Sequence, residues 1–216
     1  MKPEPQDRKP VPDESLIHRP SSWVERLPLG ELFAKTQPLE VELGAGDGSF
    51  LAQWAGAHPE RNFIGVERLL GRLRKLDRKG RRLGLRNLRL MRIEASYFME
   101  YLLPPGSLAA LHIYFPDPWP KRKHRKNRLV NEAFVAAAAR GLAPGGVVWL
   151  RTDHAEYFEQ MTTVFGAAQE FRALETPPDL AAVVTDFERE FNARGLGTWR
   201  AGYDKAAVEC RPSSRS

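Results

Sequence analysis

Residues 39–48, LEVELGAGDG, carry a short strand directly into a glycine-rich turn. Apolar residues alternate with glutamate from Leu39 to Leu43, which is the period of a β-strand. The glycines at positions 44, 46 and 48 allow a tight turn and let a ligand approach the backbone closely. A helix predicted over 49–57 begins directly after the turn, so its N–H groups face the same place. The stretch therefore predicts the first strand–turn–helix unit of an α/β fold that binds a ligand here.

The alternation of strands and helices continues along the chain. Further short strands are predicted over 62–66, 87–93, 108–115 and 147–152. Helices are predicted over 69–84, 96–103, 129–142 and 154–168. The strand at 108–115 is almost wholly apolar, as expected of a strand that is buried on both faces. We therefore predict a doubly wound, Rossmann-like sheet that is mainly parallel and has an antiparallel C-terminal strand.

Length and composition predict a single domain with loosely attached ends. The chain has 216 residues, of which 42% are hydrophobic, enough to bury one sizeable core. Five prolines and many charges in the first twenty residues are typical of a segment that does not fold by itself. We expect a flexible arm at 1–22, the domain at 23–210 and a disordered tail at 211–216.

Charge and cysteine content narrow the class of protein. The formal net charge of +6 favours a polyanionic partner, although an ordinary basic surface explains it equally well. The only cysteine, Cys210, excludes an internal disulfide and a multi-cysteine metal site, and the five histidines lack metal-ligand spacing. No apolar run approaches the roughly 20 residues of a membrane span, and no secretory signal is evident. We expect a cytoplasmic protein without a metal ion.

Acidic residues follow the strands at the points where a ligand is expected. Glu67 ends the second strand, 19 residues after Gly48, where a carboxylate suits the two ribose hydroxyls of a nucleoside. Glu42 suits an ammonium group, or is simply a charge on the outer face of its strand. Glu94 follows the third strand and suits an adenine amino group, although an exposed loop acid is nearly as good an interpretation. Asp153 follows the fifth strand.

The stretch Phe115-Pro-Asp-Pro-Trp-Pro120, after the fourth strand, is the most specific in the chain. Two prolines flank Asp117 and restrict the backbone around a carboxylate at the edge of the sheet. A turn after a buried strand rarely needs both an acid and a tryptophan for stability. We therefore interpret Asp117 as functional and Trp119 as a face on which a base can stack.

A basic run follows directly, and six of the eight residues from Lys121 to Arg128 are Lys or Arg. Dense like charge is usually a solvated loop, but this run adjoins the predicted site and favours contact with phosphates. The helix predicted over 69–84 is also strongly basic. Its charges point in nearly every direction, so only part of that helix can face a ligand.

The motifs resemble those of the bacterial tRNA (guanine-N7)-methyltransferases and occur in the same order over about 39–200. They are VELGAG at 41–46, GVE at 65–67, YFPDPWPK at 114–121, RTD at 151–153 and T-x-F-E at 185–188. The Phe-Pro-Asp-Pro-Trp segment followed by basic residues is highly specific to that family, whereas the glycine turn is not. Where the family has aspartate, this chain has Glu94, and the longer side chain moves the carboxylate outward.

The resemblance implies transfer of a methyl group from S-adenosylmethionine to N7 of a guanine in tRNA, guanine 46 of the variable loop, by a monomer or homodimer. It implies that the cofactor contacts Glu42, Gly44, Gly46, Glu67, Glu94, Ala95 and Asp117, and that Asp117 is also the key acidic residue of the catalytic site. It implies that the substrate guanosine contacts Lys121, Asp153, Thr185, Asp186, Phe187 and Glu188. It assigns the RNA to Lys123, His124, Arg125, Lys126, Asn127 and Arg128.

Three other classes of protein remain as alternatives. One is a methyltransferase of the same fold that acts on another base, a protein or a small molecule. Another is a nicotinamide dehydrogenase, which the G-x-G-x-G spacing disfavours because dinucleotide enzymes show G-x-G-x-x-G. The third is a non-catalytic RNA-binding protein of the same fold, which the acids at the strand ends disfavour.

Overall fold

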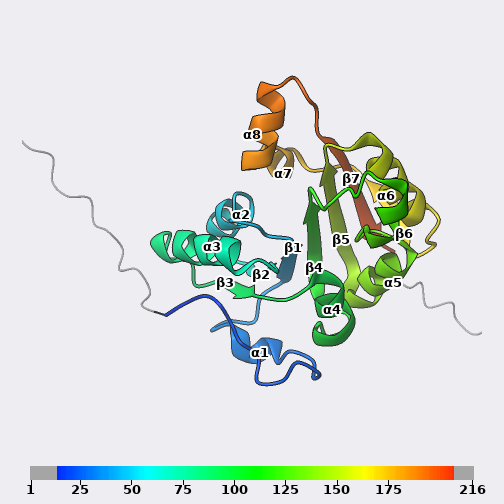
Figure 1. Cartoon of the computed structure of the whole chain (residues 1–216). Coiled ribbons are helices and arrows are strands. Elements are labelled where there is room, and N and C mark those ends of the chain that lie inside the picture. The colour runs from blue at the N-terminus through cyan, green and yellow to red at the C-terminus, as the bar shows by residue number, and fades with distance from the viewer. Residues whose placement is uncertain (1–13, 207–216) are drawn as a thin grey trace, which may run out of the picture.

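Seven strands form one sheet at the centre of the computed structural model, which describes residues 14–206 (Figure 1). Their order across the sheet is β3-β2-β1-β4-β5-β7-β6. The strands are β1 (Leu39–Leu43), β2 (Asn62–Val66), β3 (Leu88–Met91), β4 (Leu108–Tyr114), β5 (Leu142–Thr152), β6 (Phe171–Leu174) and β7 (Trp199–Lys205). β1 to β5 pair in parallel, whereas β7 runs antiparallel to β5 and β6. The predicted fold class is confirmed.

Helices cover both faces of the sheet, with α2 and α3 on one side and α5 and α6 on the other (Figure 1). The α-helices are α1 (Leu29–Leu32), α2 (Leu51–Ala57), α3 (Leu70–Arg82), α4 (Ala95–Tyr97), α5 (Glu132–Gly141), α6 (Ala155–Gly166), α7 (Pro178–Ala182) and α8 (Asp186–Ala193). A π-helix, η1 (Phe98–Leu102), extends α4, and the basic run forms a 3₁₀ helix, η2 (Arg122–Asn127). Within residues 14–206, no helix is long and apolar enough to cross a membrane.

β1 divides its side chains between the two faces of the sheet, as its alternating sequence predicts. Its leucines and valine belong to the larger apolar core, which they share with α5 and α6. Glu40 and Glu42 point to the opposite face, toward α2, and both are buried. Two acids buried in a central strand are costly unless they are paired or serve a ligand.

Residues 15–18 are attached to the domain, so the flexible arm expected at 1–22 does not include them. Leu16 is buried and its N–H donates to Oδ1 of Asp77 on α3 at 2.7 Å. The N–H of Leu90 donates to the carbonyl of Leu16, and the N–H of His18 donates to the carbonyl of Leu90. The segment thus satisfies the free edge of β3, which composition alone does not reveal. Residues 1–13 of the expected arm and the expected tail, 211–216, lie outside the described residues.

The segment between β6 and β7 carries two helices that the sequence patterns did not predict, α7 and α8. The oxygen of Thr185 accepts from the N–H of Glu188, and the Glu188 carboxylate accepts from the N–H of Thr185, which forms a capping box. The T-x-x-E pattern at 185–188 is the signal that predicts such a helix start. α8 lies beyond the carboxyl ends of the parallel strands (Figure 1).

Candidate active site

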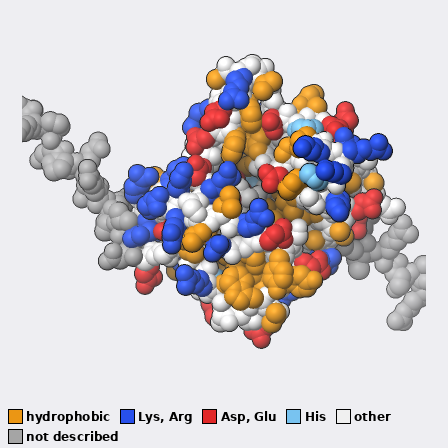
Figure 2. Space-filling model, viewed as in Figure 1, with side chains coloured by type: hydrophobic (Ala, Val, Ile, Leu, Met, Phe, Trp, Pro, Cys, Tyr) orange, Lys and Arg blue, Asp and Glu red, His pale blue; other side chains and the backbone are white. Residues whose placement is uncertain are grey.

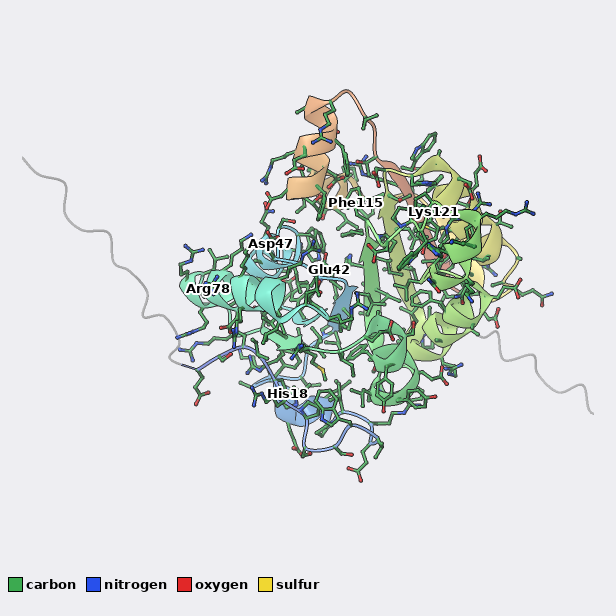
Figure 3. The ribbon with its side chains drawn as sticks, viewed as in Figure 1. His18, Glu42, Asp47, Arg78, Phe115 and Lys121 are labelled. Atoms are coloured by element: carbon green, nitrogen blue, oxygen red, sulfur yellow. The ribbon has the colours of Figure 1, made fainter. Side chains whose placement is uncertain are left out.

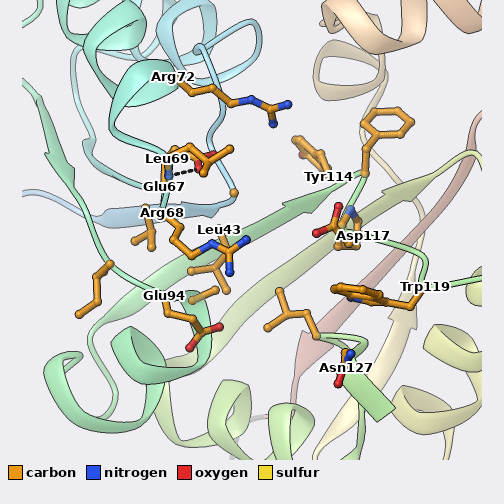
Figure 4. Close-up of a pocket in the computed structure, with 17 residues that line it drawn as sticks. Leu43, Glu67, Arg68, Leu69, Arg72, Glu94, Tyr114, Asp117, Trp119 and Asn127 are labelled. Carbon is orange, nitrogen blue, oxygen red and sulfur yellow. Dashed lines mark hydrogen bonds between the residues drawn. The ribbon is translucent and has the colours of Figure 1, made fainter. Parts of the chain in front are cut away.

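The carboxyl ends of the parallel strands open into two adjoining cavities of about 350 and 300 Å³. They share one wall, which is formed by Gly44, Arg72, Tyr114, Phe115, Pro116 and Asp117. The first cavity is also lined by Glu67, Glu94, Ala95 and Trp119, several of which appear in Figure 4. The second is also lined by Glu42, Gly46, Asp153, Thr185 and Phe187. Most of the predicted site residues are therefore brought together in one divided cleft.

The glycine turn has a backbone that side chains would not permit. Gly44, Gly46 and Gly48 have φ angles of +78°, +56° and +79°, in the left-handed region that favours glycine. A Cβ atom on Gly48 would also lie 2.1 Å from Cδ1 of Leu76 on α3. The turn therefore leaves its backbone open to the cleft, as the sequence predicted.

Glu67 is held in place at the end of β2 by two backbone N–H groups. Gly46 donates to its Oε2 at 3.1 Å, and Leu69 donates to its Oε1 at 2.6 Å, the contact drawn in Figure 4. Each oxygen keeps a further lone pair, and the carboxylate faces the first cavity. Such a fixed acceptor suits two neighbouring hydroxyl groups.

Glu42 is buried, and its Oε2 has no hydrogen-bond partner among the described residues. Burial raises the pKa of Glu42 to about 8, and the nearby acids Glu67 and Asp47 add to this, while the Arg151 guanidinium opposes it. The carboxyl group therefore carries a proton near neutral pH until a cation arrives. An unpartnered buried acid on the wall of a cavity fits the ammonium of an amino-acid ligand.

Glu94 and Ala95 line the first cavity, and Figure 4 shows Glu94 on the side away from Tyr114. The N–H of Tyr97 donates to Oε2 of Glu94 at 2.8 Å, so this side chain caps α4. Its other oxygen makes no hydrogen bond within the described chain and remains free to accept one from a ligand. The longer side chain therefore still reaches the cavity.

The turn after β4 contains two residues with left-handed backbones. Phe115 has a φ of 50° and Trp119 has a φ of 43°, which costs non-glycine residues on the order of 1–3 kcal/mol each. Asp117 lies between them, exposed, and its carboxylate has no hydrogen-bond partner within residues 14–206. The backbone thus holds a free carboxylate on the wall that the two cavities share.

The C-terminal extension closes the second cavity. The rings of Phe187 and Phe191 on α8 lie 6.1 and 6.0 Å from the ring of Phe115. Thr185, Phe187 and Asp153, which the resemblance assigns to the guanosine, line this cavity. The segment predicted from the T-x-F-E motif therefore does reach the site.

Two members of that motif do not line the cleft. Glu188 is fully buried, and its oxygens accept from the N–H of Thr185 and from the guanidinium groups of Arg151 and Arg200. Asp186 is exposed and pairs with Arg189. The structure thus gives Glu188 a supporting role beneath Thr185 in place of the guanosine contact that the resemblance implied.

The basic run also divides into buried and free members. Arg128 is buried: its guanidinium donates to the carbonyl of Pro118 at 2.7 Å and to Oε1 of Gln160 at 2.7 Å, and it pairs with Glu156. Arg125 pairs with the same glutamate at 2.6 Å. Arg128 therefore supports the turn after β4 and does not face the solvent where RNA was expected.

The remaining members of the run lie at the surface or in the cleft. Asn127 lines the first cavity, and the ring of His124 meets the edge of Trp119 at 5.9 Å. Lys121 lines neither cavity. Four cations of the run are exposed and form no ion pair with the described residues: Lys121, Arg122, Lys123 and Lys126.

Arg72 is a charged cleft residue that the sequence did not assign to the site. It lies in the first turn of α3 and lines both cavities. Its side chain extends over the opening toward Tyr114 (Figure 4). Sequence alone counted Arg72 among the charges of a basic helix, because only the packing of α3 decides which of them face the cleft.

Solved structures share this fold at low sequence identity. The 16S rRNA methyltransferase KamB matches with a TM-score of 0.60 at 16% identity, over 84% of this chain and 95% of that one. The [4+2]-cyclase SpnF matches with a TM-score of 0.55 at 12% identity, over 81% and 77% of the two chains. The sheet, with its cleft at the carboxyl ends of β1 to β4, thus places the chain in the class of Rossmann-like methyltransferase folds. SpnF, a cyclase with the same fold, shows that the fold by itself does not determine the reaction.

Sequence relatives decide the family. A family model described as "Putative methyltransferase" matches residues 36–201. The tRNA (guanine-N7-)-methyltransferase of Sodalis glossinidius is 37% identical over 80% of this chain and 74% of its own. That of Alcanivorax borkumensis is 38% identical over 82% and 76%. The chain belongs to the tRNA (guanine-N7-)-methyltransferase family of enzymes.

Proposed function

We propose that the protein transfers the methyl group of S-adenosylmethionine to N7 of guanine 46 in the variable loop of tRNA. The position of Asp117 carries the proposal. Its carboxylate is exposed, free of partners among the described residues and fixed on the wall common to both cavities. Cofactor and guanine in neighbouring cavities would both meet this group.

The first cavity and the part of the second cavity beside the glycine turn together have the donors and acceptors that S-adenosylmethionine needs. Glu42 would pair with the ammonium, Glu67 would accept from the ribose hydroxyls, and Glu94 with Ala95 would meet the adenine. The orphaned Oε2 of Glu42 and the open backbone of Gly44 and Gly46 are the observations that fit the cofactor. When bound, the cofactor supplies an electrophilic methyl group on a sulfonium.

The chemistry at guanine N7 needs no general base, because N7 has a free lone pair and carries no proton. Holding the two reactants in line therefore accounts for much of the acceleration. Positive charge develops on the guanine ring, and a fixed carboxylate stabilises it. We assign this role to Asp117, with Asp153 across the second cavity as a further acceptor for the N1–H and the exocyclic amine.

The supporting residues explain how the site keeps its shape. Arg128 ties the turn after β4 to α6, and Glu188 ties the start of α8 to Arg151. Thr185 and Phe187 then face the guanosine from α8. The exposed cations of the basic run, Lys121 among them, are left to contact the nucleotide and its phosphates.

The test is incubation of the protein with unmodified tRNA and labelled S-adenosylmethionine. Reduction and aniline cleavage should place the label at guanine N7, and a tRNA with adenine at position 46 should accept none. Label on another base or on protein would refute the proposed chemistry. In parallel, S-adenosylhomocysteine should raise the melting temperature, and NAD should not.

A further inference from the structure

One side of α3 carries a row of cations that the proposed chemistry does not use. We call Arg72, Lys75, Lys79 and Arg82 the α3 row. Their spacing of three, four and three residues places them on one face of the helix. The opposite part of the helix is buried through Leu73, Leu76, Asp77 and Gly80.

Two contacts show that the α3 row borders the cleft. Arg72 lines both cavities at one end of the row. Nζ of Lys79 donates to the carbonyl of Gly48 in the glycine turn at 3.3 Å. The row therefore runs outward from the mouth of the site for about 15 Å, at 1.5 Å per helical residue.

The charge of the α3 row is not neutralised by the protein. Arg72, Lys75 and Arg82 form no ion pair with any residue from 14 to 206. The single acid of the helix, Asp77, is occupied by Ser15 and Leu16. By contrast, two cations of the basic run share Glu156. Aligned, unpaired cations repel one another unless an anion binds to them.

The α3 row and η2 lie on opposite sides of the cleft. Figure 2 shows Lys and Arg gathered over α3 and again over η2, and Figure 3 places Arg78 and Lys121 on either side of Glu42 and Phe115. A polyanionic strand that lies between the two groups would bring one of its nucleotides to the cavities. Neutralised phosphates also supply most of the sequence-independent affinity for a nucleic acid.

We propose that the α3 row binds consecutive backbone phosphates of the tRNA strand that enters the cleft, with Arg72 holding the phosphate beside the target guanosine. The inference rests on the proposed function, since it takes tRNA as the substrate. It adds a second phosphate-binding rim to the one expected at η2. The row differs from a general basic surface because Arg72 lines both cavities and Lys79 contacts the glycine turn.

The experiment compares two pairs of substitutions that each remove two charges from α3. The test pair is Lys75→Ala with Arg82→Ala, in the row. The control pair is Arg74→Ala with Arg81→Ala, which are also seven residues apart; they lie three residues before and four residues after Asp77, on its side of the helix. tRNA affinity is measured across a salt series, with S-adenosylhomocysteine affinity as a check of the fold.

The test pair should flatten the logarithmic salt slope by about two units, since each phosphate contact contributes about one. Between about 50 and 200 mM salt, the parent should then lose roughly tenfold more affinity than the test pair. The control pair should keep the slope of the parent. Equal slopes for both pairs would overturn the inference, because the row would then contribute only general charge.

Arg72 is tested separately because it also lines the cavities. Arg72→Ala should raise KM for tRNA about tenfold and change kcat less, and Arg72→Lys should restore part of the loss. An unchanged KM would remove Arg72 from the phosphate contact. If the parent does not methylate tRNA, the proposed function fails, whereas an active parent with indistinguishable pairs refutes the α3 row alone.

Discussion

Glu40 and Glu42 lie two residues apart on the same face of β1, and the protein surrounds their carboxyl groups in opposite ways. Glu40 is enclosed: Nε1 of Trp54 donates to its Oε2 at 2.8 Å, Nε2 of His112 lies 2.8 Å from the same oxygen, and Arg61 pairs with Oε1. Glu42, nearer the cleft, has an oxygen without any partner in the described chain. We call Glu40 a closed acid, because protein groups occupy both of its oxygens, and Glu42 an open acid, because one of its oxygens has no partner in the described chain.

The pKa values follow the surroundings. Burial alone would raise the pKa of Glu40, but hydrogen bonds from His112, Arg61 and Trp54 hold it at about 2. Burial lowers the pKa of His112, so the neutral ring donates to Glu40 and accepts from the hydroxyl of Tyr114 at 2.8 Å. Burial raises the pKa of Glu42 to about 8, because the Arg151 guanidinium and a hydrogen bond with the backbone of Leu51 offset the lost water only in part.

The comparison separates structural acids from binding acids. A buried carboxylate whose oxygens are all satisfied stabilises the fold, and one that is left open is maintained for a ligand. Glu188 belongs with Glu40, since both of its oxygens are occupied. Asp117 belongs with Glu42, although it is exposed. Substitutions in the closed group should therefore change stability, and those in the open group should change binding or turnover.

The largest effect on stability is expected for Glu188→Ala. The substitution leaves the buried guanidinium of Arg151 without its carboxylate and removes the cap of α8. Breaking a buried pair in this way costs about 3–5 kcal/mol. Denaturant unfolding at neutral pH measures the loss. A change below about 1 kcal/mol, with activity lost, would move Glu188 to the open group.

Asp117→Asn should have the opposite signature. The amide keeps the shape and loses the charge, so turnover should fall by about 10²–10³, the cost of removing one preorganised electrostatic group. Stability should change by no more than about 0.5 kcal/mol, as for an exposed side chain without partners. Single-turnover methylation and denaturant unfolding of the same variant measure the two quantities. Full activity would end the assignment of Asp117 to the reaction.

Glu40→Gln tests the closed acid through pH. The folded-state pKa lies below the usual value of 4.5, so ionised Glu40 stabilises the fold above about pH 4.5, and this contribution is lost as the pH falls toward about 2. The contribution is on the order of 3 kcal/mol at neutral pH. The parent should therefore lose more stability than the variant between pH 5 and pH 3. Identical pH profiles would show that Glu40 is not closed.

The sequence predicted the parts of this molecule that depend on local patterns. The alternation in 39–43 placed both glutamates on one face, and the glycine spacing placed the turn. His112 is buried in β4, the strand whose apolar sequence predicted burial on both faces. Its link between Glu40 and Tyr114 was not predictable, because it depends on the pairing of β1 with β4.

Contacts between distant segments explain the differences at the site. In the sequence, nothing distinguishes Arg128 from the other cations of the basic run. In the structure, Glu156 and Gln160 of α6 bind its guanidinium and bury it. Glu188 was assigned to the guanosine by its place in the T-x-F-E motif, and its pairing with Arg151, 37 residues away in the sequence, is not visible in that motif. Charge composition predicts that a segment is basic, but only packing decides which of its cations remain free.

The open acid has the smallest expected effect, and it is the sharpest test of the comparison. If the ammonium of S-adenosylhomocysteine pairs with ionised Glu42, binding near neutral pH must release the proton that the raised pKa retains. Affinity should then rise with pH toward about 8, by up to about tenfold per unit. Glu42→Gln should abolish this slope and bind about tenfold more weakly at pH 8. Glu40→Gln is the matched control: it makes the same chemical change on the same face of β1, and the slope should persist. Calorimetric titration in two buffers of different ionisation enthalpy counts the released proton directly. If the parent binds S-adenosylhomocysteine without releasing a proton, Glu42 does not become ionised to pair with the ammonium. The proposed difference between Glu40 and Glu42 would then be wrong.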